Sequence, residues 1–337
     1  MKTPLAVMTL SLAALAGCAS NPSAGPDRAP GPLAPVELSL LREDALAELQ
    51  RAASDADPQQ RANAVEAFSN APARAAAVCR LGMADDHLAV RFVAAMTAGE
   101  LRDPSLRPAA EALLRDPSPV VRAAAVYASR TLGGSADPTE LGSMLLSARD
   151  TRQRAQAAFI LGELGDDSAV PLLREAAKAD PATATLAELR LFRLQIAEAL
   201  AKLGNEEAVE TVRAALYPSR PEELEAAALA CQILGEIGDR RSIDQLIYLI
   251  ERDGADRMPA EVRLAAAGAL AQLGEPGGAF VAAEYTDHEN PALRAQAAAV
   301  IGLIGSADHA EQLRDTLLDP DPLVRISAAA AVLKLRR

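Results

Sequence analysis

The residues of this sequence that could carry out chemistry are three histidines, three cysteines and a long row of arginines. The histidines, His87, His288 and His309, are far apart, and no Cys-x-x-Cys pair, glycine-rich phosphate loop or Ser/His/Asp set accompanies them. Cys79 and Cys231 lie in apolar stretches, which indicates small core residues rather than a reactive pair. We therefore expect no metal site, no cofactor and no catalytic nucleophile.

The arginines recur in a shared context with a step of 30 to 39 residues. A clear copy is Asp116-Pro117-Ser118-Pro119-Val120-Val121-Arg122, which returns near the end as the segment before Arg325. Such a step predicts a stacked repeat array. Aligning on the arginine gives nine copies, of which one has Ala227; the other eight have Arg61, Arg91, Arg122, Arg154, Arg193, Arg263, Arg294 and Arg325.

Each copy reads as a helical hairpin. A short polar residue, often followed by proline, stands four residues before the anchor and predicts a helix start. It is Asp57, Ser118, Asp150, Asn290 or Asp321 in five copies. Alanine-rich interiors favour the helix, and a glycine eleven residues after the anchor suits its end. Another helix precedes each of these, so residues 36–337 predict an all-α, right-handed α-solenoid of about nine hairpins, a curved rod.

The sequence resembles the HEAT-repeat family, most closely its short phycobilin-lyase-like subclass. The resemblance rests on the Asp/Asn/Ser-Pro-x-(Val/Leu)-Arg-x-x-Ala-Ala core and on the closing Leu-Gly-x-Leu-Gly of Leu161–Gly165. A relative of this fold, deoxyhypusine hydroxylase, holds iron with repeated His-Glu pairs, but this chain has a single one, His288-Glu289. The short repeat alone does not imply lyase activity either.

The resemblance also implies a role for the arginines. In this family the anchor arginine typically bonds to an aspartate of its own or the adjacent hairpin, so the row forms a structural ladder. An aspartate stands six residues before the anchor in four copies, namely Asp55, Asp85, Asp116 and Asp319. Ligand binding by the row is the alternative.

The N-terminal region predicts export. Residues 1–17 read as a signal peptide, too short to span a bilayer. Leu15-Ala16-Gly17-Cys18 resembles a bacterial lipobox, which implies cleavage before Cys18 and its lipidation; an ordinary signal cut after Ala16 is the alternative. Residues 18–35 then form a Pro/Ala-rich tether. The protein is expected to face the periplasm of a bacterial cell envelope, and Ala19 favours the outer membrane.

Charge narrows the class of partner. The chain has 34 basic and 46 acidic residues, a net charge of −12. A chain this acidic, without a basic cluster, is expected to bind nucleic acid poorly and to be repelled by an anionic lipid surface. The alternative is that the charge simply keeps the alanine-rich array soluble. We expect a protein or peptide partner, and contact with the membrane only through the lipid anchor.

Helical phase suggests where a partner would bind. Offsets +5 and +9 from the anchor share a face that fits the concave surface of a solenoid, and the +9 residues read as solvated. At +5, three successive hairpins have large side chains, beside two glutamates at +9. The candidate partner-binding residues are Met96, Tyr127, Phe159, Glu100 and Glu163. Packing of the three large side chains between hairpins is the alternative.

These patterns together predict a membrane-anchored, non-catalytic scaffold that presents a concave groove to a protein of the cell envelope. The runner-up is an accessory or chaperone-like subunit for an exported enzyme or assembly. A small-molecule-binding enzyme comes third.

Overall fold

A computed structural model describes residues 33–179 and 184–336. The signal peptide, Cys18 and most of the tether lie outside these residues. Within the described part the chain contains only α-helices, short 3-10 turns and loops. The prediction of an all-α solenoid is confirmed.

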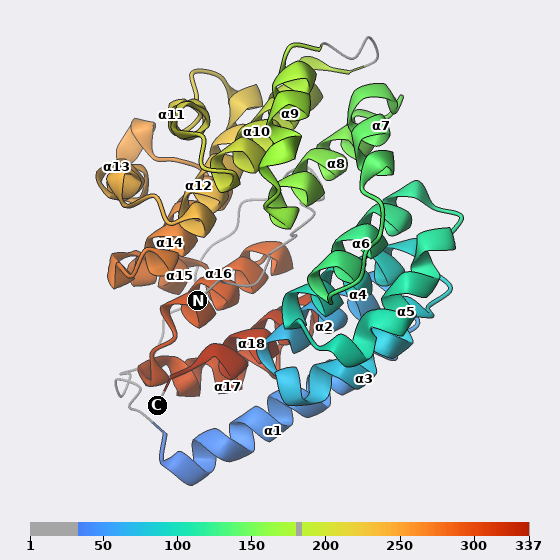
Figure 1. The fold of residues 1–337 in the computed structure, drawn as a ribbon. Helices are drawn as coiled ribbons and strands as arrows, with labels where there is room; N and C mark the ends of the chain where they lie inside the picture. The colour runs from blue at the N-terminus through green and yellow to red at the C-terminus, as the bar shows by residue number, and fades with distance from the viewer. Residues whose placement is uncertain (1–32, 180–183, 337) are drawn as a thin grey trace.

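The helices form nine hairpins, as the arginine alignment predicted (Figure 1). The first helices of the hairpins are α1 (Pro35–Ala52), α3 (Pro72–Met83), α5 (Arg107–Ala112), α7 (Thr139–Ser147), α9 (Val170–Ala177), α11 (Glu206–Ala214), α13 (Ile243–Glu251), α15 (Ala279–Tyr285) and α17 (Ala310–Thr316). The second helices, which carry the anchors, are α2 (Pro58–Ala67), α4 (Leu88–Leu101), α6 (Pro119–Thr131), α8 (Thr151–Leu164), α10 (Leu186–Lys202), α12 (Leu224–Ile237), α14 (Ala260–Gln272), α16 (Pro291–Ile304) and α18 (Pro322–Lys334).

The predicted start signals act as helix caps with one exception. Asp57, Asp150, Asn290 and Asp321 each accept a hydrogen bond from the backbone N–H two residues later. Ser118 does not cap through its side chain. The predicted glycines end their helices in the left-handed region, with φ between +67° and +84°; they are Gly133, Gly165, Gly204, Gly238, Gly274 and Gly305.

Neighbouring second helices pack in two alternating ways. A glycine eight residues after the anchor lets the next helix approach closely in every other hairpin. A Cβ on Gly162 would lie 2.7 Å from the Cα of Ala199, and one on Gly302 would lie 2.7 Å from the Cα of Ala331. We call these contacts close joints: α4–α6, α8–α10, α12–α14 and α16–α18. The contacts between the remaining neighbours, which lack this glycine, are less extensive and are called wide joints.

The row of second helices closes on itself. Contacts run from α2 through α4 and each later second helix to α18, and α18 then packs against α2 and α1 (Figure 1). The second helices line the inside of this ring and the first helices lie outside. The expected curved rod is therefore bent until its two ends meet, and the last helix is covered by the first hairpin of the same chain.

The core extends around the whole ring. Alanine, leucine, valine and isoleucine from both helices of each hairpin fill it, and Cys79 and Cys231 are fully buried within it. Burial raises the pKa of both thiols to about 12, so both are inert. None of the described helices combines the length and the apolar character needed to cross a membrane.

Candidate functional site

The anchor arginines connect successive hairpins. Arg61 donates from Nε and Nη2 to the two carboxylate oxygens of Asp85 in the next hairpin, at 2.8 Å each. Its Nη1 donates to the carbonyl oxygens of Asp55 and Ala56 in its own hairpin, at 3.0 Å. Arg91 with Asp116, and Arg294 with Asp319, repeat the arrangement. Bidentate pairs of this kind fix orientation as well as adding energy, so each one sets how two hairpins stack.

The aspartates of this ladder are also held in place by backbone N–H groups of their own loops. Asp85 accepts the backbone N–H of His87 at 2.8 Å, and Asp319 accepts that of Asp321 at 2.8 Å. The hydrogen bonds from Arg61 lower the pKa of Asp85 to about 2, and those from Arg294 lower the pKa of Asp319. Both carboxylates are therefore ionised at any physiological pH, and the ladder is a fixed structural feature.

Some rungs of the ladder differ. Arg122 pairs with Glu140, and the buried Arg263 pairs with Glu284 and donates to the carbonyl oxygen of Ile250. Arg154 donates to the carbonyl oxygen of Ala148 at 2.6 Å. In the sixth hairpin, which has Ala227, a pair from the outer helix α11 connects to the seventh hairpin instead: Arg213 and Asp239, at 2.5 and 2.7 Å.

The predicted aromatic row is largely inside the protein. Met96 and Tyr127 are only 3% and 5% exposed. Tyr127 lies over Gly99 of the neighbouring helix, where an added Cβ would come within 2.5 Å of its ring. For these two side chains the structure shows the alternative, packing between hairpins. Their assignment to a surface groove came from helical phase alone. Helical phase within one helix does not show that Gly99 of the neighbouring helix, which has no side chain, leaves space for the Tyr127 ring.

The other three candidates, Phe159, Glu163 and Glu100, are partly buried on the inside of the ring. Phe159 lies beside Lys202, whose Nζ is 4.9 Å from the centre of its ring. Lys202 also pairs with Glu163 at 2.6 Å, with Glu198, and with Glu236 at 3.5 Å. Lys202 on α10 thus pairs with carboxylates from α8, α10 and α12.

This cluster corrects one expectation of the sequence analysis. The +9 residues Glu163, Lys202 and Glu236 were expected to be solvated, yet their side chains are only 16 to 17% exposed. The alternation of acid, base and acid at +9 in three successive hairpins was visible in the sequence and was the signal for it. Sequence reasoning placed Lys202 and Glu198 on this inner face, at offsets +9 and +5, but did not include them among the candidate partner-binding residues.

The cluster contains three glutamates and one lysine. Burial raises the pKa of Glu236 to about 7, against the lowering effect of Lys202, and burial also raises the pKa of Glu198. The surrounding carboxylates outweigh desolvation and raise the pKa of Lys202. The lysine is therefore a permanent cation and no candidate for a nucleophile. The arrangement can hold a polar partner group on the inner surface.

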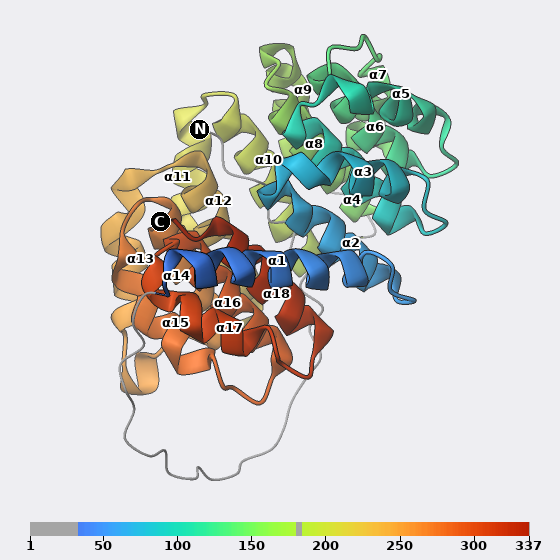
Figure 2. The same ribbon diagram turned by 90° about the horizontal axis from the view of Figure 1, so that it is seen from below.

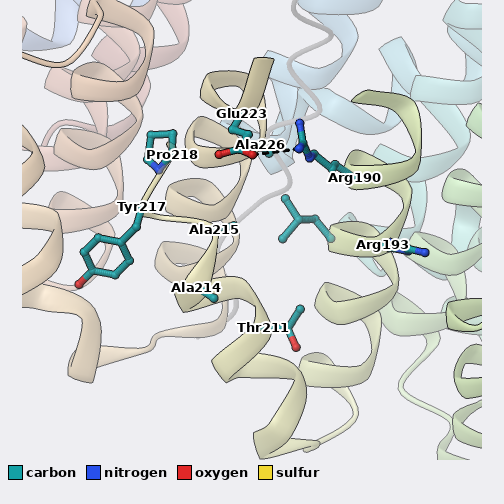
Figure 3. A pocket seen from close by; sticks show the side chains of 10 residues that line it. Arg190, Arg193, Thr211, Ala214, Ala215, Tyr217, Pro218, Glu223 and Ala226 are labelled. Atoms are coloured by element: carbon teal, nitrogen blue, oxygen red, sulfur yellow. Dashed lines mark ion pairs between the residues drawn. The ribbon is translucent and has the colours of Figure 1, made fainter. Parts of the chain in front are cut away.

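A separate pocket of about 300 Å³ lies between α10, α11 and α12, at the hairpin that lacks the anchor arginine (Figure 3). Leu194, Ala215 and Ala226 contribute apolar walls. Arg190 and Glu223 form an ion pair of 2.9 Å at one end, and Thr211 lies at the other. The interruption of the ladder thus coincides with a small cleft on the side of the ring.

Two of the three histidines have structural roles at helix starts. His87 begins α4, and its Nδ1 accepts the N–H of Ala89 at 3.3 Å; His288 accepts the N–H of Asn290 at 3.0 Å. No group of three or more His, Cys, Asp or Glu side chains in the described ranges is arranged to hold a metal ion.

Comparison with known families decides what kind of protein this is. The family of HEAT repeats matches residues 76–153, 138–230 and 279–336, more than half of the chain. The chain belongs to the HEAT-repeat family. The matched ranges contain six of the anchor arginines: Arg91, Arg122, Arg154, Arg193, Arg294 and Arg325. No curated protein matched the sequence of this HEAT-repeat protein.

Solved structures resemble the HEAT-repeat protein in fold. Human deoxyhypusine hydroxylase in complex with glycerol has 19% identity and a TM-score of 0.36, with 88% of this chain and 98% of that chain covered. The CpcE–CpcF complex of phycocyanin lyase from Nostoc sp. PCC7120 has 21% identity and a TM-score of 0.32, covering 77% and 94%. An engineered protein has 16% identity and a TM-score of 0.35, covering 88% and 94%.

Proposed function

We propose that this HEAT-repeat protein is a lipid-anchored, non-catalytic scaffold that binds a protein or peptide partner in the bacterial cell envelope. The observation that carries the proposal is the inner surface of α8, α10 and α12. There Phe159, Glu163 and Lys202 form, together with Glu236, a preorganised polar and aromatic surface that spans three hairpins. Aromatic side chains beside fixed charges are typical of the residues that anchor protein interfaces.

The hydrogen bonds and ion pairs of Lys202 and of two histidines support a scaffold rather than an enzyme. Lys202 is held as a cation by three neighbouring glutamates, and His87 and His288 accept hydrogen bonds from backbone N–H groups at helix starts. HEAT repeats generally mediate protein interactions. A scaffold needs shape and fixed chemistry on its surface, and both are provided by the ring.

Anchoring to the membrane is supported by the Leu15-Ala16-Gly17-Cys18 segment of the sequence. Several acyl chains on Cys18 would hold the protein stably, as one chain alone would not. Cys18→Ser should release the protein from the membrane fraction into the soluble fraction of the cell. Equal membrane retention of the variant and the wild-type protein would refute the anchor without affecting the scaffold proposal.

Partner binding is tested by photo-crosslinking in intact cells. A crosslinker at Thr131, on the inner helix α6, should yield one defined adduct, and a crosslinker at Leu81, 73% exposed on the outer helix α3, should not. Phe159→Ala should remove the adduct. The matched control Phe280→Ala changes an aromatic ring that likewise lies near a cationic side chain, here Arg263, but is on the outer helix α15. Adducts of the same kind from both positions, or loss with both alanine variants, would contradict an inner binding surface.

A further inference from the structure

The first helix bridges the two ends of the chain. α1 packs more extensively along α18 of the last hairpin than along α2, the other helix of its own hairpin (Figure 2). Its apolar face is fully covered there, through Leu38, Leu41, Ala45, Leu49 and Ala52. We call the contact of α18 with α1 and α2 the seam.

Two arginines hold the seam together. Arg325, the last arginine of the ladder, donates from Nε to Glu48 Oε1 of α1 at 2.8 Å, a contact across 277 residues of sequence. Arg42 of α1 donates from Nη2 to the carbonyl oxygen of Leu335 at 2.7 Å, across 293 residues. Glu48 is only 6% exposed. The ladder is therefore continued through the seam, with a glutamate of the first hairpin taking the place of the next aspartate.

In its packing the seam differs from the close joints. At the position where Gly302 allows α16 to approach Ala331 of α18, the last hairpin has Leu333. α18 meets α2 in a wide joint, and the more extensive contact of the seam is the one between α18 and α1. Adjacent hairpins elsewhere are also connected directly by the chain, so parted helices stay neighbours. Across the seam no peptide connection exists, and once parted the two ends separate freely.

We propose that the seam is a clasp, the one joint at which the ring opens into an open solenoid. Opening would release α1 from α18 and uncover the apolar faces of both helices together with the inner helices. Whether a folded partner reaches the inner surface by this route rests on the proposed function, whereas the opening itself does not. An opened chain can also exchange its first hairpin with a second copy, because the uncovered faces are complementary.

Two matched variants of the full-length chain test the clasp. Arg325→Gln and Arg294→Gln each remove a ladder arginine that donates to a carboxylate and to two backbone carbonyls. Only Arg325 lies at the seam. Amide hydrogen exchange of α1 should become about tenfold faster in Arg325→Gln, which the loss of one charge-assisted hydrogen bond can produce, and should stay unchanged in Arg294→Gln.

Small-angle scattering and sedimentation complete the test. Arg325→Gln should show a larger maximum dimension as a monomer, or a dimer that forms by exchange of hairpins; either result supports opening at the seam. Arg42→Gln, which removes a single hydrogen bond, is the milder variant if Arg325→Gln does not fold, and should shift both readouts in the same direction. Equal acceleration of exchange along the whole chain in both ladder variants would overturn the clasp. Faster exchange of α1 without any change in size or mass would also overturn it, since the helix would then fray while the ring stays closed.

Discussion

The joint between α16 and α18 and the seam between α18 and the first hairpin use the same ladder chemistry and differ in their packing. Arg294 and Arg325 each bond to two carbonyls of their own loop and to a carboxylate across the joint. In the first case Gly302 brings the backbones into contact, whereas in the second the equivalent position is Leu333 and the contact of α18 with α2 is less extensive. The arginine therefore sets the register of two hairpins, while the glycine sets how closely they pack.

The strongest test of the close joints concerns α4 and α6. Tyr127→Ala should lower the free energy of unfolding by about 4 kcal/mol, because it empties a buried site against Gly99. Chemical denaturation measures it. The control Tyr248→Ala changes a tyrosine that is 55% exposed on α13 and should change stability by less than about 0.5 kcal/mol. A small effect of Tyr127→Ala would return Tyr127 to the predicted partner-binding surface.

The wide joint between α10 and α12 is tested through its buried carboxylate, Glu236. The pKa of Glu236 is about 7 in the folded protein, above its value of 4.5 in an unfolded chain, so the folded state binds this proton more tightly. The protonated Glu236 therefore contributes to the free energy of unfolding. This contribution is fully present below pH 4.5 and is lost as the pH rises to about 7, a loss of at most about 3 kcal/mol.

Glu236→Gln should remove that part of the pH dependence, as measured by denaturant unfolding between pH 5 and 8. Glu198, Glu163 and Lys202 remain in the variant. Glu251→Gln, an exposed change on the outer helix α13, should keep the wild-type profile. If the Glu236→Gln and wild-type profiles have the same slope, the carboxylate is not buried against its neighbours.

A pair of glycine substitutions separates close packing from helix propensity. Gly302→Ala should destabilise by about 1 kcal/mol or more, because its Cβ would meet the backbone of Ala331, and overpacking outweighs the gain in propensity. Gly268→Ala, in the interior of α14, has room, with Leu303 Cδ1 at 3.4 Å, and should stabilise by about 0.5 kcal/mol. Stabilisation by both would show that close joints do not depend on glycine.

How much of the molecule the sequence predicts depends on whether the signal is local. The caps at Asp57 and Asn290 and the left-handed glycines follow from their immediate neighbours, and the structure has them where predicted. The repeat step likewise predicted nine hairpins. Burial of Tyr127 depends on a glycine in another hairpin, and helical phase within one helix does not detect it.

Closure of the ring was the least predictable feature. Glu48 stands in an ordinary helical stretch, outside the aspartate motif of the ladder, and nothing near it indicates a partner 277 residues away. The small rotation between neighbouring hairpins is added up nine times, so a modest change per joint decides between an open superhelix and a closed ring. That sum depends on the alternation of close and wide joints, which becomes visible only in three dimensions.

The most direct test of the closed ring is a distance measured across the seam in solution, with spin labels at the exposed positions Ser39 on α1 and Arg336 after α18. Arg42 of α1 donates to the carbonyl oxygen of Leu335, and packed helices lie about 10 Å apart. The closed ring therefore predicts one narrow population of short label-to-label distances. A broad population extending toward about 80 Å, the span of nine hairpins stacked at that spacing, would contradict the closed ring.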